Sequence, residues 1–560
     1  MTFNKVVFDI ETTMTADKIW CIVCKHGDTY YQFKEDRLHR FAELIKQTEE
    51  VIGHNIIGFD IPVVNTIFGY DVFANCKVTD TLVLSRLLNP MIEGGHSLKN
   101  WGTKLGQNKI HFEQFDYFSE DMLTYCRNDV ELTERLYKFL INKTKDFGMS
   151  IELEHKVAQI IQKQHERGFK INVVEAYELQ SKFQEDMNDL TTKVRQTFPP
   201  MKIEEEFIPK SNNKARGYVK GVPFTKVKYK EFNLGSRQQI AERLMLLGWK
   251  PKKKTDKGHV IVDEKVLSEI HNIPEAKLIN RFLMLQKRIA QVNSWIEGIK
   301  EDGRVHGKVI TNGTITGRMS HQSPNMAQIP AVYSPYGKEC RALWTVNKGY
   351  KLVGVDASGL ELRMLAHYMN DKDYIYEVVN GDIHRANQAA AGLESRDKAK
   401  TFIYAFIYGA GSAKIGSIIG GSTADGERAK EKFLRATPSL RSLREKVERV
   451  AQRRWVRGLD QRKIIIRHPH AALNTLLQGA GAIVMKYALT LLEQYVINKQ
   501  IKAFPVVNVH DEFQYEVEES RAEEFGRLAV QSIIDAGKKL NIRCPLNGKY
   551  KIGNNWSETH

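Results

Sequence analysis

Two short strings of acidic residues lie in the C-terminal half of this chain, and their residue types suit metal-assisted chemistry. Asp356 belongs to residues 355–363, and Asp511 with Glu512 ends residues 509–512. Each string follows an apolar run of strand length, so we expect the acids at strand ends. Acids at the ends of adjacent strands would hold two divalent ions about 3.5 to 4 Å apart, which serves phosphoryl transfer. For either string alone, the alternative is a strand-end or turn residue without chemistry.

The segment between the two strings predicts a helix with one cationic and aromatic face. Arg396, Lys400 and Tyr404 recur every four residues, and Tyr408 follows one turn later, so a helix would align them. Two cations followed by an aromatic ring suit a nucleoside triphosphate, with phosphates near the cations and the base or sugar near Tyr404. The alternative is a surface helix whose aromatic rings pack into the core.

A third acidic string, near the N-terminus, indicates a second site. Asp9 and Glu11 close an apolar run of strand length, and Tyr125 and Asp129 are four residues apart, so on a helix they would share a face. Two independent acidic clusters in one chain indicate a protein that both makes and cuts phosphodiester bonds.

The composition favours a polyanionic partner. Lys and Arg number 83 against 67 Asp and Glu, which gives a formal net charge of +16. Nucleic acid would match this charge, and so would an anionic membrane surface. No apolar run approaches the ~18 residues of a spanning helix, and the charges of Lys5, Asp9 and Glu11 are atypical of a signal peptide. We therefore expect a cytoplasmic protein with no membrane partner.

Six scattered cysteines do not make a disulfide framework in a chain of 560 residues, and they suit a reducing compartment. Cys21 and Cys24 form a C-x-x-C with His26 close behind, so a zinc or redox role is the alternative. No second pair follows at ligand spacing, and structural zinc takes four ligands. Buried small side chains on a strand are therefore the favoured interpretation.

The chain length predicts about three to four domains. The first ~145 residues alternate strand and helix signals, as in an α/β domain. Helical spacing of apolar residues over 179–194 and 278–296 predicts two long helices that pair antiparallel as a projecting arm. Between them, residues 199–231 are rich in lysine and should form a basic, irregular excursion. It either contacts a phosphate backbone or a partner, or is only a solvated face.

The C-terminal strings and the helix between them resemble motifs A, B and C, in order, of the family A (polymerase I-like) DNA polymerases. The resemblance extends to Thr316-Gly317-Arg318, to residues 325–330 and to residues 470–478. It implies a right hand of palm, fingers and thumb. It also implies that Asp356, Ala357 and Asp511 bind two Mg²⁺ ions, which Mn²⁺ could replace, and that Glu512 joins the catalytic set.

The same resemblance gives roles to further residues. Those expected at the incoming nucleotide are Arg396, Lys400, Tyr404, Tyr408, His384 and Glu361, and those expected near the primer-template are Arg318, Gln328, Asn474, Gln478 and His510. Glu361 and Tyr404 would crowd the sugar 2′ position, which makes DNA the product. Tyrosine at position 404, where many relatives carry phenylalanine, implies tolerance of dideoxynucleotides.

The N-terminal acids carry a second resemblance. Residues 8–12, 54–62 and 125–129 resemble the three Exo motifs of the DnaQ-like 3′–5′ exonucleases. The resemblance implies that Asp9, Glu11, Asp60 and Asp129 hold two divalent ions, and that Tyr125 helps to orient the attacking water. Because none of these acids is replaced, we predict active proofreading.

The expected fold class is α/β and α+β multidomain, a DnaQ/RNase H-like exonuclease domain followed by a right-hand polymerase. The expected domains are the exonuclease at 1–145, the thumb at 146–300 with its tip at 199–231, the palm at 301–383 and 466–560, and the fingers at 384–465. Within family A, residues 80–87 and 334–341 and the Gly-Asn-Asn-Trp556 ending resemble the phage replicative branch. We therefore expect an enzyme that replicates phage DNA in the host cell cytoplasm.

The expected partners are primer-template DNA and dNTPs, with a replicative helicase-primase and a single-strand binding protein as further candidates. Some relatives carry a longer insertion at the arm tip that recruits host thioredoxin. Because residues 199–231 form a short tip, thioredoxin is left open as a partner. A family A repair or gap-filling polymerase is the first alternative, and a non-catalytic DNA-binding replisome scaffold is the second. A single-subunit RNA polymerase is disfavoured by Glu361 and by the complete exonuclease motifs.

Overall fold

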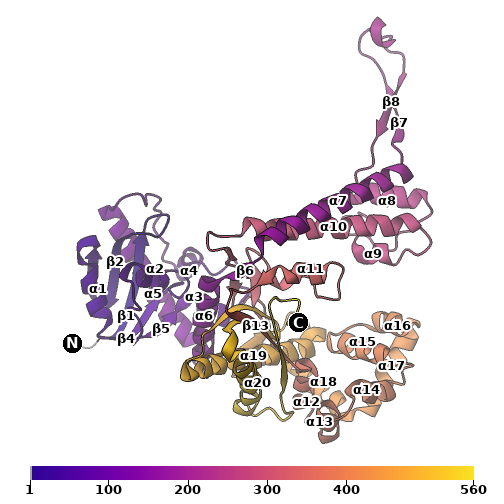
Figure 1. The fold of residues 1–560 in the computed structure, drawn as a ribbon. Helices are drawn as coiled ribbons and strands as arrows, with labels where there is room; N and C mark the ends of the chain where they lie inside the picture. The colour runs from indigo at the N-terminus through magenta and orange to yellow at the C-terminus, as the bar shows by residue number, and fades with distance from the viewer. Residues whose placement is uncertain (1–2) are drawn as a thin grey trace. The chain divides into compact units, whose positions relative to one another are not determined.

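The computed structural model describes residues 3–560, except for the side chain of Glu35 (Figure 1). Contacts divide the chain into two compact units. One comprises the chain through Lys170 together with His306–His560, and the other is Ile171–Val305. Each unit has a hydrophobic core of its own. The mixture of sheets and helices agrees with the predicted fold class.

A five-stranded sheet of order β3-β2-β1-β4-β5 forms the N-terminal part of the first unit. β1 runs antiparallel to β2 and parallel to β4. Alternate residues of β1 enter different cores, Phe8 on one face and Val7 on the other, because helices cover both faces of the sheet. The strands are β1 (Phe3–Thr12), β2 (Ile19–His26), β3 (Thr29–Lys34), β4 (Thr48–Gly53) and β5 (Lys77–Asp80).

Six helices follow or interrupt these strands. They are α1 (Leu38–Ile45), α2 (Asp60–Phe68), α3 (Thr81–Leu88), α4 (Leu98–Leu105), α5 (Glu120–Thr144) and α6 (Ser150–Arg167), with a 3₁₀ turn at η1 (Glu35–Arg37). Asp80 caps α3, because its carboxylate accepts the backbone N–H of Leu82. The same carboxylate accepts the N–H groups of Asn55 and Ile57. One buried acid thus fixes the loop that leads into α2.

Cys21 and Cys24 are buried on β2. Cys21 belongs to the core shared with α5, whereas Cys24 belongs to the core on the other face. Residues three apart on a strand point to opposite faces, so these two thiols do not converge on one metal ion. The interpretation as buried small side chains is confirmed.

A four-stranded antiparallel sheet of order β16-β17-β13-β18 organises the C-terminal part. Its strands are β13 (Tyr350–Ala357), β16 (Ala503–Val509), β17 (Glu512–Glu518) and β18 (Gly548–Gly553). Helices α19 (Ala472–Lys499) and α20 (Ala522–Lys539) share its core. Within the described chain, one helical span, Pro469–Lys499, has the length and apolarity to cross a membrane, and 89% of its most apolar window is buried inside the protein.

Helices dominate residues 360–451. They are α12 (Leu360–Met369), α13 (Lys372–Val379), α14 (Ile383–Ala391), α15 (Arg396–Ile407), α16 (Ser412–Ile419), α17 (Thr423–Ala436) and α18 (Pro438–Ala451). Smaller elements of this unit are β10 (Lys308–Ile310), β11 (Ser320–Gln322), η3 (Met326–Gln328), α11 (Gly337–Ala342), β12 (Trp344–Thr345), β14 (Trp455–Arg457), β15 (Lys463–Ile465), η4 (Pro469–Ala471) and η5 (Glu519–Arg521).

A buried ion cluster links α6 to α19. Glu154 of α6 is fully buried, and its Oε1 lies 2.7 Å from Lys486 Nζ and 2.6 Å from Arg462 Nη1. Arg462 also pairs with the buried Asp460, with Nη2 and Oδ2 2.6 Å apart. Charges are tolerated in a core when they are paired and hydrogen-bonded.

The second unit is built on two long helices, α7 (Val173–Thr197) and α10 (Pro274–Glu297). The amide of Gln180, near the start of α7, donates to Asn293, near the end of α10, at 2.7 Å. The helices therefore run antiparallel, as predicted. Shorter elements complete the unit: α8 (Arg237–Leu246), α9 (Glu264–Ser268) and η2 (Lys214–Arg216). Strands β6 (Phe169–Ile171) and β9 (Arg304–Val305) lie where the chain passes between units.

The prediction of an irregular excursion at residues 199–231 was wrong. Residues Met201–Phe207 (β7) and Phe224–Lys230 (β8) form an antiparallel hairpin whose register pairs Met201 with Lys230, seen beyond α7 in Figure 1. Lys226, Lys228 and Lys230 alternate with other residues at the period of a strand. Both faces of the hairpin are largely exposed, so neither face is apolar. The alternation of apolar and polar residues that indicates a strand is therefore weak in this segment.

Candidate active sites

Asp356 and Asp511 lie at the same end of the C-terminal sheet. β13 and β17 are antiparallel neighbours, and their register pairs Asp356 with Glu512. The backbone N–H of Ala357 donates to the carbonyl oxygen of Asp511 at 3.1 Å. Two acids that are far apart in sequence thus meet at one end of the sheet, where its central strands β13 and β17 lie side by side.

The electrostatics of this pair fit a bound cation. Burial, followed by the charges of Asp511 and Glu512, raises the pKa of Asp356 to about 6. Burial also raises the pKa of Asp511. Like charges held close together disfavour ionisation until a cation neutralises them. Carboxylate oxygens are hard ligands of the kind that Mg²⁺ accepts, so the donor set fits a divalent ion.

Glu512 is turned toward the C-terminal tail. Its Oε1 accepts from Trp556 Nε1 and from Gln514 Nε2, both at 2.6 Å, and its Oε2 lies 2.9 Å from His560 Nδ1. Although burial opposes ionisation, His560 and Gln514 hold the pKa of Glu512 below its usual value. Trp556 is itself buried, so the tail packs into the fold.

One face of α15 carries the predicted cations and tyrosines. The Ser395 side chain caps the helix, and Tyr408 ends it. Lys400, Tyr404 and Tyr408 line one cavity of about 710 Å³, a volume typical of small-molecule sites. The His384 ring lies 6.3 Å from the Tyr404 ring, centroid to centroid. Arg396 Nε lies 2.7 Å from Asp382 Oδ2, which holds this guanidinium beside α14.

Glu361 joins α15 to the loop that carries Arg318. The Tyr408 hydroxyl donates to Glu361 Oε2 at 2.8 Å, and Arg318 Nη2 lies 3.0 Å from Glu361 Oε1. The Arg318 charge also lowers the pKa of His510 and of Asp511, although burial is the larger effect on each. Residues of motifs A, B and C are therefore in contact or in electrostatic reach of one another.

The remaining residues expected near DNA come from α19, from η3 and from two loops. Asn474 and Gln478 are one turn apart on α19 and remain partly exposed, although most of that helix is buried. Polar residues with one shared open face on a core helix are suited to a ligand outside the core. Gln328 ends η3. Arg318 and His510 line one small cavity.

The N-terminal acids form a second, more deeply buried cluster. Asp9 and Glu11 are two residues apart on β1 and point the same way. Asp60 is the first residue of α2, and Asp129 lies on α5 one turn from Tyr125. One oxygen each of Asp9 and Glu11 and the Cys126 sulfur lie within 4.8 Å of one another. The four predicted acids are brought together from three elements.

Repulsion within this cluster is strong. Burial and then the charge of Asp129 raise the pKa of Glu11 to about 9, and burial raises that of Asp60 to about 7. Burial and the charge of Asp60 also raise the pKa of Asp9. Asp129 Oδ1 is buried and has no hydrogen-bond partner among the described residues. Four hard oxygen donors with an unmatched buried lone pair fit divalent cations.

Comparison with known proteins decides the family. The sequence profile of "DNA polymerase family A" matches residues 215–558. The chain belongs to DNA polymerase family A. It is 32% identical to the DNA-directed DNA polymerase of Enterobacteria phage T3, over 99% of this chain and 100% of the phage protein. It is 34% identical to that of Escherichia phage T7, over 87% and 88% of the two chains.

The fold of this family A polymerase also matches a solved structure. The POL domain of Pol1 from M. smegmatis, in complex with DNA primer-template and dNTP, aligns with a TM-score of 0.82 at 18% identity, over 99% of this chain and 95% of that chain. The family and the phage relatives identify the activity as DNA-directed DNA synthesis. Family A polymerases depend on divalent metal ions. The profile match begins after the module that carries the N-terminal acids.

Nothing in the sequence indicates that Lys109 belongs to the N-terminal cluster of the polymerase. Its Nζ lies 2.5 Å from Asp129 Oδ2 and 4.7 Å from the centre of the Tyr125 ring. The Lys109 charge lowers the pKa of Asp9, Glu11 and Asp129. Lys109 lies between α4 and α5 in a segment without regular structure, where no periodicity exists to reveal it.

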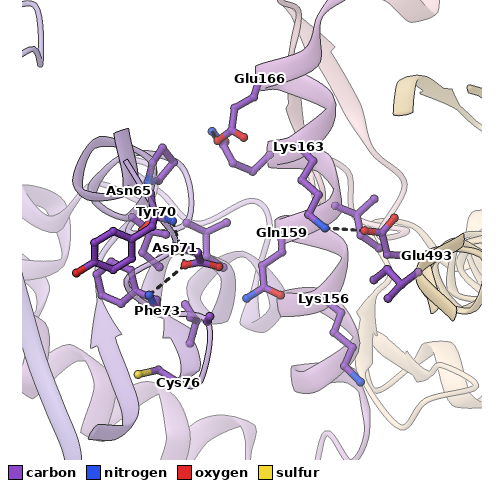
Figure 2. Close-up of a pocket in the computed structure, with 18 of the residues that line it drawn as sticks. Asn65, Tyr70, Asp71, Phe73, Cys76, Lys156, Gln159, Lys163, Glu166 and Glu493 are labelled. Carbon is purple, nitrogen blue, oxygen red and sulfur yellow. Dashed lines mark hydrogen bonds and ion pairs between the residues drawn. The ribbon is translucent and has the colours of Figure 1, made fainter. Parts of the chain in front are cut away.

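A larger cavity of the polymerase, about 890 Å³, lies apart from both acidic clusters. Figure 2 shows its walls, formed by Tyr70 and Asp71 near α2, by Lys163 on α6 and by Glu493 on α19. Lys163 Nζ and Glu493 Oε1 form an ion pair at 2.6 Å, and the Asp71 carboxylate accepts the backbone N–H of Phe73. Lys163 and Glu493 thus neutralise each other in the wall of this cavity.

Proposed function

We propose that this polymerase copies a DNA template during phage replication and removes its own errors at a separate 3′–5′ exonuclease site. The observation that carries the proposal is the convergence of Asp356 and Asp511 at one end of the C-terminal sheet, with Asp511 in electrostatic reach of Tyr404 on the cationic face of α15. The second acidic cluster, around Asp9 and Glu11, supports the exonuclease.

In the proposed synthesis site, Asp356, Asp511 and the Ala357 carbonyl would hold Mg²⁺. The bound ions would activate the primer 3′ hydroxyl and stabilise charge on the transferred phosphorus. Arg396, Lys400 and His384 bind the triphosphate of the incoming nucleotide, which matches an anion to cations. Glu512 would support the acid pair through its contacts with Trp556 and His560, which fix the C-terminal tail.

Two features around the newly formed base pair would select the correct deoxynucleotide: the shape of the site and contacts in the minor groove. Glu361, held by Tyr408, closes the space at the sugar 2′ position together with Tyr404, so deoxynucleotides are preferred. Minor-groove acceptors sit similarly for all correct base pairs. The proposed readers are Arg318, Gln328, Asn474, Gln478 and His510.

In the proposed exonuclease site, Asp9, Glu11, Asp60 and Asp129 would hold two divalent ions, which would supply a nucleophilic water and stabilise the leaving oxygen. Tyr125 orients that water from the same face of α5 as Asp129. Lys109 holds the Asp129 carboxylate in place.

The proposed domains are the exonuclease at 1–145, the thumb at 146–300, the palm at 301–383 and 466–560, and the fingers at 384–465. The separation of Ile171–Val305 as a compact unit supports a distinct thumb. The proposed partners are primer-template DNA, dNTPs, a helicase-primase and a single-strand binding protein, in the host cytoplasm. The thumb hairpin β7–β8 is the place where a processivity partner would bind.

Opposed variants test the two sites. Asp511→Ala should abolish primer extension and leave degradation of a single-stranded 3′ end intact. The double variant Asp9→Ala, Glu11→Ala should do the reverse. Retained extension in the first variant would contradict the synthesis site, and degradation at the wild-type rate in the second would contradict the exonuclease.

A further inference from the structure

A polar cleft of about 260 Å³ lies beside the N-terminal acidic cluster and belongs to neither active site. One wall comes from the loop before α2, through Asn55 and Gly58, and from Arg86 on α3. The opposite wall comes from Lys308 on β10 and Gln322 on β11. Each wall thus contributes one cation and at least one amide.

The charge of this cleft is positive. Among the described lining residues, Asp80 is the one acid, and its carboxylate is already engaged by the backbone N–H groups of Asn55, Ile57 and Leu82. Arg86 forms no hydrogen bond or ion pair with a described residue, and burial lowers its pKa. The charge of Asp80 opposes that effect, although its carboxylate accepts no hydrogen bond from the guanidinium. Lys308 is exposed and likewise unpaired within the described chain. A half-buried guanidinium without hydrogen-bond partners is costly, so an anion from outside would stabilise it.

The position of the cleft relates it to both reactions. The His54 ring, next to Asn55, lies within electrostatic reach of both Lys109 and Arg86. Asp80, which lines the cleft, lies within electrostatic reach of Asp60 in the acidic cluster. β10 and β11 pair as a hairpin, and the loop between them carries Arg318, which reaches Glu361 in the synthesis site.

We propose that Arg86 and Lys308 bind a backbone phosphate of single-stranded DNA whose 3′ end has entered the exonuclease cluster. A guanidinium matches a phosphodiester in two parallel hydrogen bonds, and an exposed ammonium adds a point charge. The amides of Asn55 and Gln322 are suited to further phosphate or sugar oxygens. The inference rests on the proposed exonuclease and adds its strand-binding groove.

Exonuclease kinetics on two substrates test the groove. The first is a single-stranded oligonucleotide, and the second is the nitrophenyl ester of thymidine 5′-monophosphate, which has no second phosphate. Arg86→Leu and Lys308→Leu should each raise KM for the oligonucleotide about tenfold, with kcat little changed. Each should also reduce the dependence of log KM on log salt by about 0.7, the contribution of one single-strand phosphate contact. Arg86→Lys should raise KM for the oligonucleotide less than Arg86→Leu does, because lysine keeps the positive charge.

Controls separate the groove from the active site. Arg40→Leu changes the same charge on the exposed face of α1 and should leave both substrates unaffected. Lys308 is exposed, so its variant tests the groove even if Arg86→Leu fails to fold. If Lys308→Leu leaves KM and its salt dependence unchanged, the proposed DNA-binding role of the cleft is refuted, while the proposed exonuclease is not. If the wild type hydrolyses neither substrate, the exonuclease itself is refuted.

Discussion

The two acidic sites differ in how many carboxylates they gather and in what surrounds them. The proposed synthesis site joins two aspartates, of which Asp511 is in electrostatic reach of Arg318 and of Tyr404 on α15. Lys400 lines the same cavity as Tyr404. The N-terminal cluster gathers four acids around Lys109, and its pKa values are raised further. A nucleoside triphosphate brings several negative charges, whereas a cleaved phosphodiester brings one. Under the proposed assignment, the protein supplies acids where its substrate carries little charge, and cations where its substrate carries much.

Removing a cation from the proposed synthesis site should impair catalysis more than removing one from the N-terminal cluster. Lys400→Met should lower kcat/KM for dNTP about 50-fold, because a charge-assisted contact to the triphosphate is worth about 1.5 to 3 kcal/mol. Single-nucleotide extension measures the effect. Lys446→Met, on the exposed face of α18, is the matched control. A comparable loss of exonuclease activity would show that the two sites are not separate.

Removing Lys109 from the N-terminal acidic cluster should impair the proposed exonuclease and not DNA synthesis. The loss should be smaller than the loss caused by Lys400→Met. Lys109→Met should lower exonuclease kcat about tenfold, because Asp129 loses the partner that holds it. Primer extension should stay unchanged. Lys104→Met, an exposed position on α4, serves as the control. Wild-type degradation by Lys109→Met would exclude a positioning role for this lysine.

Tolerance of dideoxynucleotides should depend on the Tyr404 hydroxyl. Tyr404→Phe should increase discrimination against dideoxynucleotides about tenfold, the effect of one polar contact near the sugar. Competition between a dNTP and its dideoxy analogue in primer extension measures the ratio. Tyr376→Phe is a suitable control, since Tyr376 is 62% exposed. If Tyr404→Phe and the wild type show the same incorporation ratio, Tyr404 does not act on the sugar of the incoming nucleotide.

The pH dependence of stability should report the raised pKa of Glu11 in the N-terminal cluster, with a more modest effect. Glu11 has a pKa raised from 4.5 to about 9, so the stability it contributes is complete below pH 4.5 and is lost as the pH rises to about 9. In a chelator, the first unfolding transition should therefore fall by about 2 °C or more over this range. Glu11→Gln should flatten the curve, whereas the exposed Glu49→Gln should not. Mg²⁺ should restore part of the loss.

The sequence predicted the parts of both sites that lie on regular elements. Asp356 and Asp511 could be placed together because each ends an apolar strand, and Arg396 to Tyr408 because helical spacing aligns them. Lys109 and Arg86 escaped prediction, since one lies in an irregular segment and the other resembles an ordinary cation on an amphipathic helix. The contact of Glu512 with Trp556 could not be predicted from local sequence patterns, because it joins residues from different elements. The hairpin β7–β8 was missed because charge outweighed its alternation.

The ion cluster of Glu154, Lys486 and Arg462 determines where this chain can be divided. A fragment that starts at about Ser150 keeps Glu154 with its two cations and should retain a stable C-terminal part. A fragment that starts after Arg167 would leave Lys486 and Arg462 buried with one acid fewer, and breaking such a buried pair costs about 3 to 5 kcal/mol. Of these two cut points, the one between α5 and α6 therefore keeps the ion cluster intact, although the chain is helical on both sides of it.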